Sequence, residues 1–183
     1  MADWITHVCV GYALFTVASW RLNWLNARWI VVGIVGSVLP DLNRIRLVVD
    51  GEWIEAALGV PFEWGGLHTL GGVLLMAAVG ALLFEHEQDG RLIDIHQRRA
   101  FGLLLTGALS HIAVDLPQPY ADGRLLTNIY FFPVTSWRGP TPGWYVSADR
   151  WVAVLAVAVA GAVFLADRYR TTTDADTAIP SDD

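Results

Sequence analysis

Five residues whose side chains bind metals or move protons lie at the ends of apolar stretches of the sequence. They are His7, Asp41, His68, His111 and Asp115. Imidazole nitrogens and carboxylate oxygens are common ligands of zinc and related divalent ions. Ionisable side chains are costly in or near hydrocarbon, so they usually have partners there and mark functional positions. The sequence therefore predicts a metal site, provided that the fold brings these residues together.

The apolar stretches are long enough, or nearly so, to cross a membrane as helices. A transmembrane helix needs about 20 mainly apolar residues, with about 17 as a lower limit. The stretches cover residues 4–20, 27–42, 67–84, 100–116 and 151–166. The second has a short uncharged core and could instead be a re-entrant or half-buried helix. We expect an all-α fold, a polytopic integral membrane helical bundle with about five transmembrane helices.

The overall composition agrees with a membrane protein. Hydrophobic residues make up 54% of the 183 residues and charged residues 16%, whereas soluble domains have about 25% charged residues. No block of basic residues indicates nucleic-acid binding, so the expected partner is the lipid bilayer. We expect one membrane-embedded domain over residues 1–170. Residues 171–183 carry four aspartates and no basic residue, which predicts an acidic disordered tail.

Alternate crossing of the membrane would bring all five residues to the same face. His7 lies near the start of the first stretch, and Asp41 ends the second. His68 begins the third stretch, whereas His111 and Asp115 end the fourth. This convergence depends on alternation alone and fails if the second stretch does not cross.

The tryptophans and arginines bear on membrane orientation. All nine tryptophans lie at the ends of stretches or in loops, where membrane proteins have their aromatic belts. Basic residues favour the cytoplasmic side of a membrane. If the N-terminus is outside, seven of the twelve arginines fall on the inner side and five on the outer side. The seven on the inner side are Arg21, Arg28, Arg91, Arg98, Arg99, Arg168 and Arg170. We therefore expect a multi-pass protein of the cell membrane with its site on the extracytoplasmic face.

Two connections between the stretches are long. Residues 43–66 contain the amphipathic sequence GEWIEAAL, which suits a helix lying in the membrane interface. Residues 117–150 are rich in proline, glycine and aromatic side chains. Long loops of this kind are often functional. Since this loop leaves directly from Asp115, it is placed to cover the site.

His111 and Asp115 have the spacing of two residues on one helix face. Both could bind one metal, or Asp115 could orient the imidazole of His111. Each of the five residues also has an ordinary interpretation, as a structural polar pair, a helix-boundary acid or an interfacial histidine. Their gathering at one depth favours a site. His86 and His96 lie in a short polar loop, and we expect both to be solvated.

The motifs, read in order, resemble those of the membrane-bound metal-dependent hydrolases of the YdjM-like type. That family has a His in its first helix, a Pro-Asp-x-Asp after its second and a His-Arg-Gly-x-x-His-Ser motif. A Ser-His-x-x-x-Asp helix follows, with a proline-tyrosine-glycine loop and a Pro-Phe turn after it. This chain has T-H-V-C-V-G at 6–11, L-P-D-L-N at 39–43, G-G-L-H-T at 65–69, S-H-I-A-V-D-L at 110–116, P-Y-A-D-G at 119–123 and F-F-P-V at 131–134. The resemblance covers residues 6 to about 138 and implies His7, Asp41, His68, His111 and Asp115 as the metal site.

The chain departs from that pattern at three positions. Asn43 stands where the family usually has a second Asp, and Glu63 stands where it has the first His of its His-Arg-Gly motif. Trp64 replaces the Arg of that motif. Glu63 could still bind a metal through oxygen or act as a base. With one carboxylate and one imidazole fewer, a site for one metal is favoured over a site for two.

These observations predict a metal-dependent hydrolase. A divalent ion, Zn²⁺ by ligand type, would lower the pKa of a bound water to about 7, and Asp41 or Glu63 would take the proton. A site at the membrane surface suggests a lipid-linked ester or phosphoester as substrate, with Arg124 or Arg138 on an anionic group. The alternative is a non-catalytic membrane protein with a structural metal site or polar network. A transporter is disfavoured because the ionisable residues gather at one end.

Overall fold

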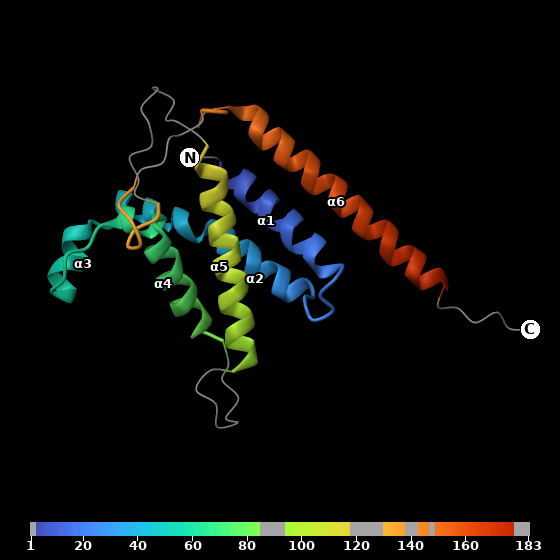
Figure 1. Ribbon diagram of the computed structural model, residues 1–183, viewed down its shortest axis with the longest axis horizontal. Helices are drawn as coiled ribbons and strands as arrows, with labels where there is room; N and C mark the ends of the chain where they lie inside the picture. Colours follow the sequence, from blue (N-terminus) through green and yellow to red (C-terminus); the bar gives the residue numbers. More distant parts are fainter. Residues whose placement is uncertain (1–2, 85–93, 118–129, 138–142, 147–148, 178–183) are drawn as a thin grey trace, which may run out of the picture.

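The computed structural model describes residues 3–84, 94–117, 130–137, 143–146 and 149–177. Within these ranges every regular element is helical, which confirms the predicted all-α fold for the described part of the chain (Figure 1). The elements are α1 (Trp4–Ser19), α2 (Ala27–Val38), the 3₁₀ helix η1 (Leu39–Leu47), α3 (Gly51–Leu58), the 3₁₀ helix η2 (Trp64–His68), α4 (Leu70–Ala81), α5 (Ile95–Asp115) and α6 (Arg150–Thr177).

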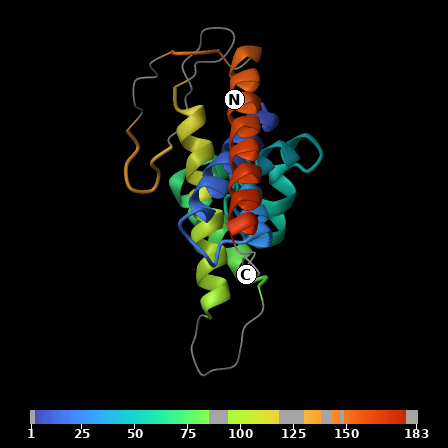
Figure 2. The ribbon, with the colours of Figure 1, turned by 90° about the vertical axis from the view of Figure 1, so that its right-hand side faces the viewer.

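The helices form a bundle in which α2 and α5 make the central pair. α1 packs against α2, and α4 packs against α5. α6 packs along α1 on one side of the bundle (Figure 1), and Figure 2 views the molecule from that side, with α6 in front. The short helices η1 and η2 pack against each other at one end. α3 corresponds to the predicted amphipathic segment and has no buried residue.

Side-chain caps fix where the central helices begin. Asn26 accepts hydrogen bonds from the backbone N–H groups of Arg28 and Trp29 at the start of α2. Asp94 and Gln97 form a reciprocal capping box at the start of α5. Such caps satisfy backbone donors that have no partner within the helix. The capping box therefore fixes the start of α5, the helix that carries His111 and Asp115 at its far end.

Proline ends α2 just before the site. Pro40 follows the last turn of α2, and the chain continues as η1. Proline lacks a backbone donor and restricts the residue before it, so an α-helix rarely continues past it. The predicted span 27–42 is therefore an α-helix only to Val38, and Asp41 lies in the first turn of η1.

Glycines let α2 and α5 approach to backbone contact. A Cβ atom added to Gly107 would lie 2.3 Å from the carbonyl oxygen of Gly33 and 2.6 Å from the nitrogen of Ser37. One added to Gly36 would lie 2.5 Å from the carbonyl oxygen of Leu104. Small residues at such crossings are typical of helices packed in membranes. This close crossing sets the distance between Ser37 and His111.

Of the described helices, only α6 is long and apolar enough for a full crossing, over Arg150–Thr173. α1 and α4 are apolar but shorter. α2 and α4 have 12 residues each, or about 18 Å of helix against a hydrocarbon core of about 30 Å. The outer surface of the bundle is nevertheless strongly apolar. Val31, Leu75 and Leu165 are 57%, 62% and 68% exposed.

α6 continues beyond residue 170, where the sequence predicts that the domain ends. The helix runs to Thr177, and residues 178–183 lie outside the described part. The hydroxyl of Thr171 donates to the carbonyl of Asp167, and that of Thr172 donates to the carbonyl of Tyr169. Threonine hydroxyls bonded to the preceding turn are compatible with helix. The first part of the predicted tail therefore extends α6.

Candidate metal centre

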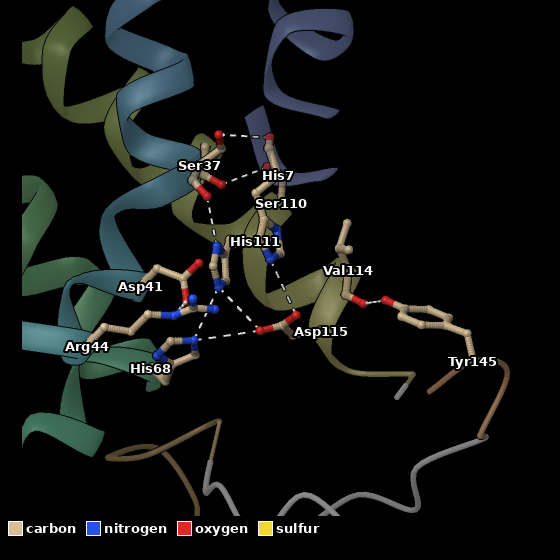
Figure 3. A network of polar contacts seen from close by, with 11 residues as sticks. His7, Ser37, Asp41, Arg44, His68, Ser110, His111, Val114, Asp115 and Tyr145 are labelled. Atoms are coloured by element: carbon tan, nitrogen blue, oxygen red, sulfur yellow. Dashed lines mark hydrogen bonds and ion pairs between the residues drawn. The ribbon is translucent and has the colours of Figure 1, made fainter. Parts of the chain in front are cut away.

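Four different elements bring the five predicted site residues into one cluster. His7 comes from α1, Asp41 from η1 and His68 from the end of η2, whereas His111 and Asp115 come from the last turns of α5. Their side chains meet at the end of the bundle where these elements converge (Figure 3). All five are buried, with exposures between 0% and 1%. We call this group the His/Asp cluster.

Asp115 lies at the centre of the His/Asp cluster. Its Oδ1 is 3.5 Å from Nε2 of His7. Its Oδ2 is 3.3 Å from Nε2 of His111 and 3.7 Å from Nε2 of His68. The two histidine nitrogens are themselves 3.2 Å apart. One carboxylate thus faces three imidazoles, each through its Nε2 atom.

A backbone carbonyl fixes the orientation and tautomer of His111. Nδ1 of His111 lies 2.8 Å from the carbonyl oxygen of Ser37. A carbonyl only accepts, so Nδ1 carries a proton, and the opposite nitrogen, Nε2, faces Asp115 and His68. The ring also stacks on His7, with centroids 3.6 Å apart and planes at 13°. A second nitrogen held by a carbonyl is typical of metal-binding histidines.

The separations within the His/Asp cluster match the edges of a coordination shell. Zn–N bonds of about 2.0–2.1 Å in tetrahedral geometry place two ligand atoms about 3.3–3.4 Å apart. The separations among the ligand atoms of His7, His68, His111 and Asp115 that are in contact run from 3.2 to 3.7 Å. Two groups have ligand atoms within 4.8 Å of one another, His7 with His111 and Asp115, and Asp41 with His68 and His111. His111 belongs to both groups.

The buried polar atoms of the cluster also fit a bound cation. Nδ1 of His7 and Nδ1 of His68 have no hydrogen-bond partner among the described residues, and Nε2 of His7 has only its 3.5 Å contact with Asp115. A buried polar atom without a partner is costly, and a buried carboxylate needs a compensating positive charge. A divalent ion would provide both a bond to His7 and charge for Asp115. The donor set therefore fits the expected metal.

An arginine that the sequence did not single out lies beside the cluster. Nε of Arg44 is 3.5 Å from Oδ1 of Asp41, and the Arg44 side chain is 44% exposed. Its guanidinium lies over the ring of Trp4, 5.2 Å from the centroid. Arg44 is thus a cation that reaches from the surface to the edge of the cluster. The i,i+3 spacing from Asp41 was the signal for this pair in the sequence.

Parts of the long loop contact the ends of the site helices. The backbone carbonyls of Tyr130 and Phe132 accept hydrogen bonds from the N–H groups of Leu70 and Gly71, just after His68. The hydroxyl of Tyr145 donates to the carbonyl of Val114, next to Asp115. Burial, and secondly the charge of Asp115, raises the pKa of Tyr145 to about 12. The phenol is therefore a neutral donor at physiological pH.

Glu63 lies outside the His/Asp cluster. It is exposed at the start of η2 and lines a separate hollow of about 260 Å³ together with Arg46 and Asp50. In a 3₁₀ helix, residues share a side when they are three positions apart. Residues 63 and 68 are five positions apart, so their side chains point in different directions. The structure thus brings His68, but not Glu63, to the cluster.

The other residues singled out in the sequence are not among the grouped metal ligands. Asn43 is 8% exposed, and its Oδ1 has no hydrogen-bond partner in the described part of the chain. His96 is 44% exposed beside Asp94, 3.6 Å away. His86, Arg124 and Arg138 lie outside the described residues.

Comparison with protein-family models gives a match over residues 1–178 to the family described as YdjM inner membrane protein. Neither the curated proteins nor the solved structures include a match to this chain.

Proposed function

The chain belongs to the YdjM inner membrane protein family, and from that premise and the geometry of the His/Asp cluster we propose that it is a metal-dependent hydrolase. The observation that carries this proposal is the convergence of three imidazole Nε2 atoms on the buried carboxylate of Asp115. His7, His68, His111 and Asp115 would hold one divalent ion, with zinc favoured by the ligand types.

The chain's own residues would divide the remaining work. When bound, a divalent ion lowers the pKa of a water ligand to about 7 and so provides a nucleophile near neutral pH. Asp41 would accept the proton, because its carboxylate belongs to the group with His68 and His111. The half-exposed Arg44, next to Asp41, would bind the anionic oxygen of the substrate. Ser37 would hold His111 in its ligand orientation through the bond to Nδ1.

An apolar groove beside the cluster supports a lipid-linked ester or phosphoester as substrate. The groove has a volume of about 380 Å³ and lies between α1, the end of α5 and α6. Its lining includes Thr6 and Val114, the chain neighbours of His7 and Asp115, and extends along α6 to Val159. This volume is within the range of about 300–1,000 Å³ for ligand sites. A hydrocarbon chain in this groove would bring its attached ester or phosphoester to the cluster.

The complete burial of the cluster supports a second candidate function. All five side chains are no more than 1% exposed, whereas a catalytic metal needs a position open to water and substrate. A structural metal site, or a polar network that joins α1, η1, η2 and α5, would have this burial. Such a centre would stabilise the bundle without turnover.

We also propose that the bundle crosses the membrane five times, with the His/Asp cluster at the extracytoplasmic end. The guanidinium of Arg99 lies over Trp24, and that of Arg170 lies over Trp20. These contacts gather arginines of α5 and α6 around the connection between α1 and α2. Basic residues favour the cytoplasmic side, so the opposite end would face out.

Single cysteines introduced into a Cys9→Ser background test this topology. Asn23 follows α1, Glu55 lies on α3 and Ser136 lies in the long loop, and all three are exposed. In intact spheroplasts, an impermeant maleimide should label Glu55→Cys and Ser136→Cys, and should label Asn23→Cys only after lysis. Labelling of Glu55→Cys together with Asn23→Cys would mean that α2 does not cross.

The substitution Asp41→Asn tests the proposed division of roles. It keeps the size of the side chain and removes the proton acceptor, so we expect metal content to stay unchanged and turnover to fall by about 10²–10⁴-fold. The assay would use long-chain and short-chain phosphoesters and carboxylic esters with the purified, metal-loaded protein. Faster hydrolysis of the long-chain compounds would support the groove. If Asp41→Asn loses the metal, Asp41 is a ligand and not the proton acceptor. If the wild-type protein holds metal but hydrolyses none of the esters, the structural alternative is favoured.

A further inference from the structure

A second groove lies at the end of the bundle opposite the His/Asp cluster. It has a volume of about 410 Å³ and runs between α1 and α5. Leu14, Ala18 and Leu22 line it on the side of α1, and Arg98, Arg99 and Gly102 line it on the side of α5. The proposed reaction uses none of these residues. We call this the α1–α5 groove.

The α1–α5 groove is cationic at one end and apolar along the rest of its length. Arg98 is exposed and Arg99 is half-buried, with its guanidinium 4.8 Å from the centroid of the Trp24 ring. From Arg99 the lining continues along α5 to Thr106, seven residues further on, which is about 11 Å of helix. Gly102 lies between Arg99 and Thr106 on α5, and a Cβ atom added to it would have no neighbour within 4 Å. The apolar part of the groove is therefore open at Gly102, and Arg98 and Arg99 line the groove next to it.

This polarity matches an anionic phospholipid. Arginine forks bind phosphate oxygens, and basic pockets between helices at the cytoplasmic end of membrane proteins bind anionic headgroups. The apolar part between α1 and α5 would take an acyl chain along the membrane normal. A soluble phosphate compound would use the guanidinium groups only and leave the apolar channel without an occupant.

We propose that the α1–α5 groove binds an anionic phospholipid, with its phosphate on Arg98 and Arg99 and one acyl chain beside Gly102. This site is independent of the His/Asp cluster and does not require hydrolase activity. A bound lipid would fill the surface between α1 and α5 near the start of α5. It would thereby favour the packing that places the far end of α5 at the cluster.

Native mass spectrometry of the full chain, released from detergent after titration with defined lipids, tests the proposal. We expect wild type to retain one phosphatidylglycerol in preference to phosphatidylcholine. Arg98→Gln/Arg99→Gln should weaken phosphatidylglycerol binding by about thirtyfold, since each basic residue near the membrane surface contributes a factor of about five. Gly102→Leu should also displace the lipid while leaving both arginines in place.

Two variants on α6 serve as matched controls. Arg168→Gln/Arg170→Gln removes the same charge from exposed positions outside the groove, and Gly161→Leu adds the same side chain at another open glycine. Both should bind phosphatidylglycerol as wild type does. If Arg168→Gln/Arg170→Gln weakens phosphatidylglycerol binding as much as Arg98→Gln/Arg99→Gln does, the effect is general charge attraction and the proposed site is wrong. Equal retention of phosphatidylcholine, or binding of glycerol 3-phosphate as tight as that of the lipid, would overturn the proposal.

Discussion

Replacing His111 with alanine should abolish the metal binding that we propose for the His/Asp cluster. Nε2 of His111 is 3.2 Å from Nε2 of His68 and 3.3 Å from Oδ2 of Asp115, and His111 belongs to both groups of possible ligands. Every arrangement of one ion within the cluster therefore uses this nitrogen. Loss of a supporting contact to a metal-binding histidine typically lowers affinity by about 10–100-fold, so loss of the ligand itself should exceed about a hundredfold. Metal analysis of protein purified in detergent should find stoichiometric metal in wild type and almost none in His111→Ala.

The substitution His96→Ala is the control for this experiment. His96 lies on the same helix at the opposite end, is 44% exposed and is 3.6 Å from Asp94. Its loss should leave the metal content unchanged. Circular dichroism and gel filtration would show whether His111→Ala remains folded, because a metal-free but helical variant isolates the ligand effect. Wild-type protein without stoichiometric metal would falsify the hydrolase proposal. Metal retained by His111→Ala would mean that the metal binds outside the His/Asp cluster.

The residues of the His/Asp cluster follow from the sequence because two simple regularities suffice to find them. Helices that alternate in direction bring the start of one stretch beside the end of the next, so His7, Asp41 and His68 share a depth. A spacing of four residues then adds Asp115 to the face of His111. Neither step requires knowledge of how any two side chains pack.

The sequence is less informative where backbone geometry decides. Ser37 orients His111 through its carbonyl, and a carbonyl is present at every residue, so no residue type marks this role. Glu63 is close to His68 in the chain, but the 3₁₀ turn of η2 separates their directions. The second and third predicted spans are longer than the α-helices found there, whereas α5 and α6 are longer than the spans predicted for them. The turn at Pro40 replaces the end of the predicted second span, and the third predicted span begins with η2.

The distance between packed helices is also not predictable from composition, although glycines indicate where two helices can approach closely. The glycines of the third and fourth stretches suggest close contacts, yet they are not equivalent in the structure. Gly107 lies against the backbone of α2, whereas Gly102 faces open space on the same helix. The direction of each glycine depends on the rotation of α5, and the central packing of the bundle determines that rotation.

This difference predicts opposite effects for two alanine substitutions on α5. In Gly107→Ala the new Cβ would lie 2.3 Å from the carbonyl oxygen of Gly33 and 2.6 Å from the nitrogen of Ser37. Backbone atoms cannot rotate away, so α2 and α5 must separate. We expect a loss of about 1–3 kcal/mol in the free energy of unfolding, the range for overpacked sites. Gly102→Ala meets no atom within 4 Å and should gain up to about 1 kcal/mol from helix propensity.

The same separation should reach the His/Asp cluster, because His111 lies one turn beyond Gly107. Its Nδ1 is 2.8 Å from the carbonyl of Ser37, and Ser37 is among the residues that the new Cβ would displace. Gly107→Ala should therefore weaken metal binding by about 10–100-fold, as loss of a supporting contact does, while Gly102→Ala binds metal normally. Thermal unfolding in detergent and metal titration of both variants measure the two effects. Equal stability and equal metal affinity in the two variants would contradict a backbone crossing of α2 and α5 as the support of His111.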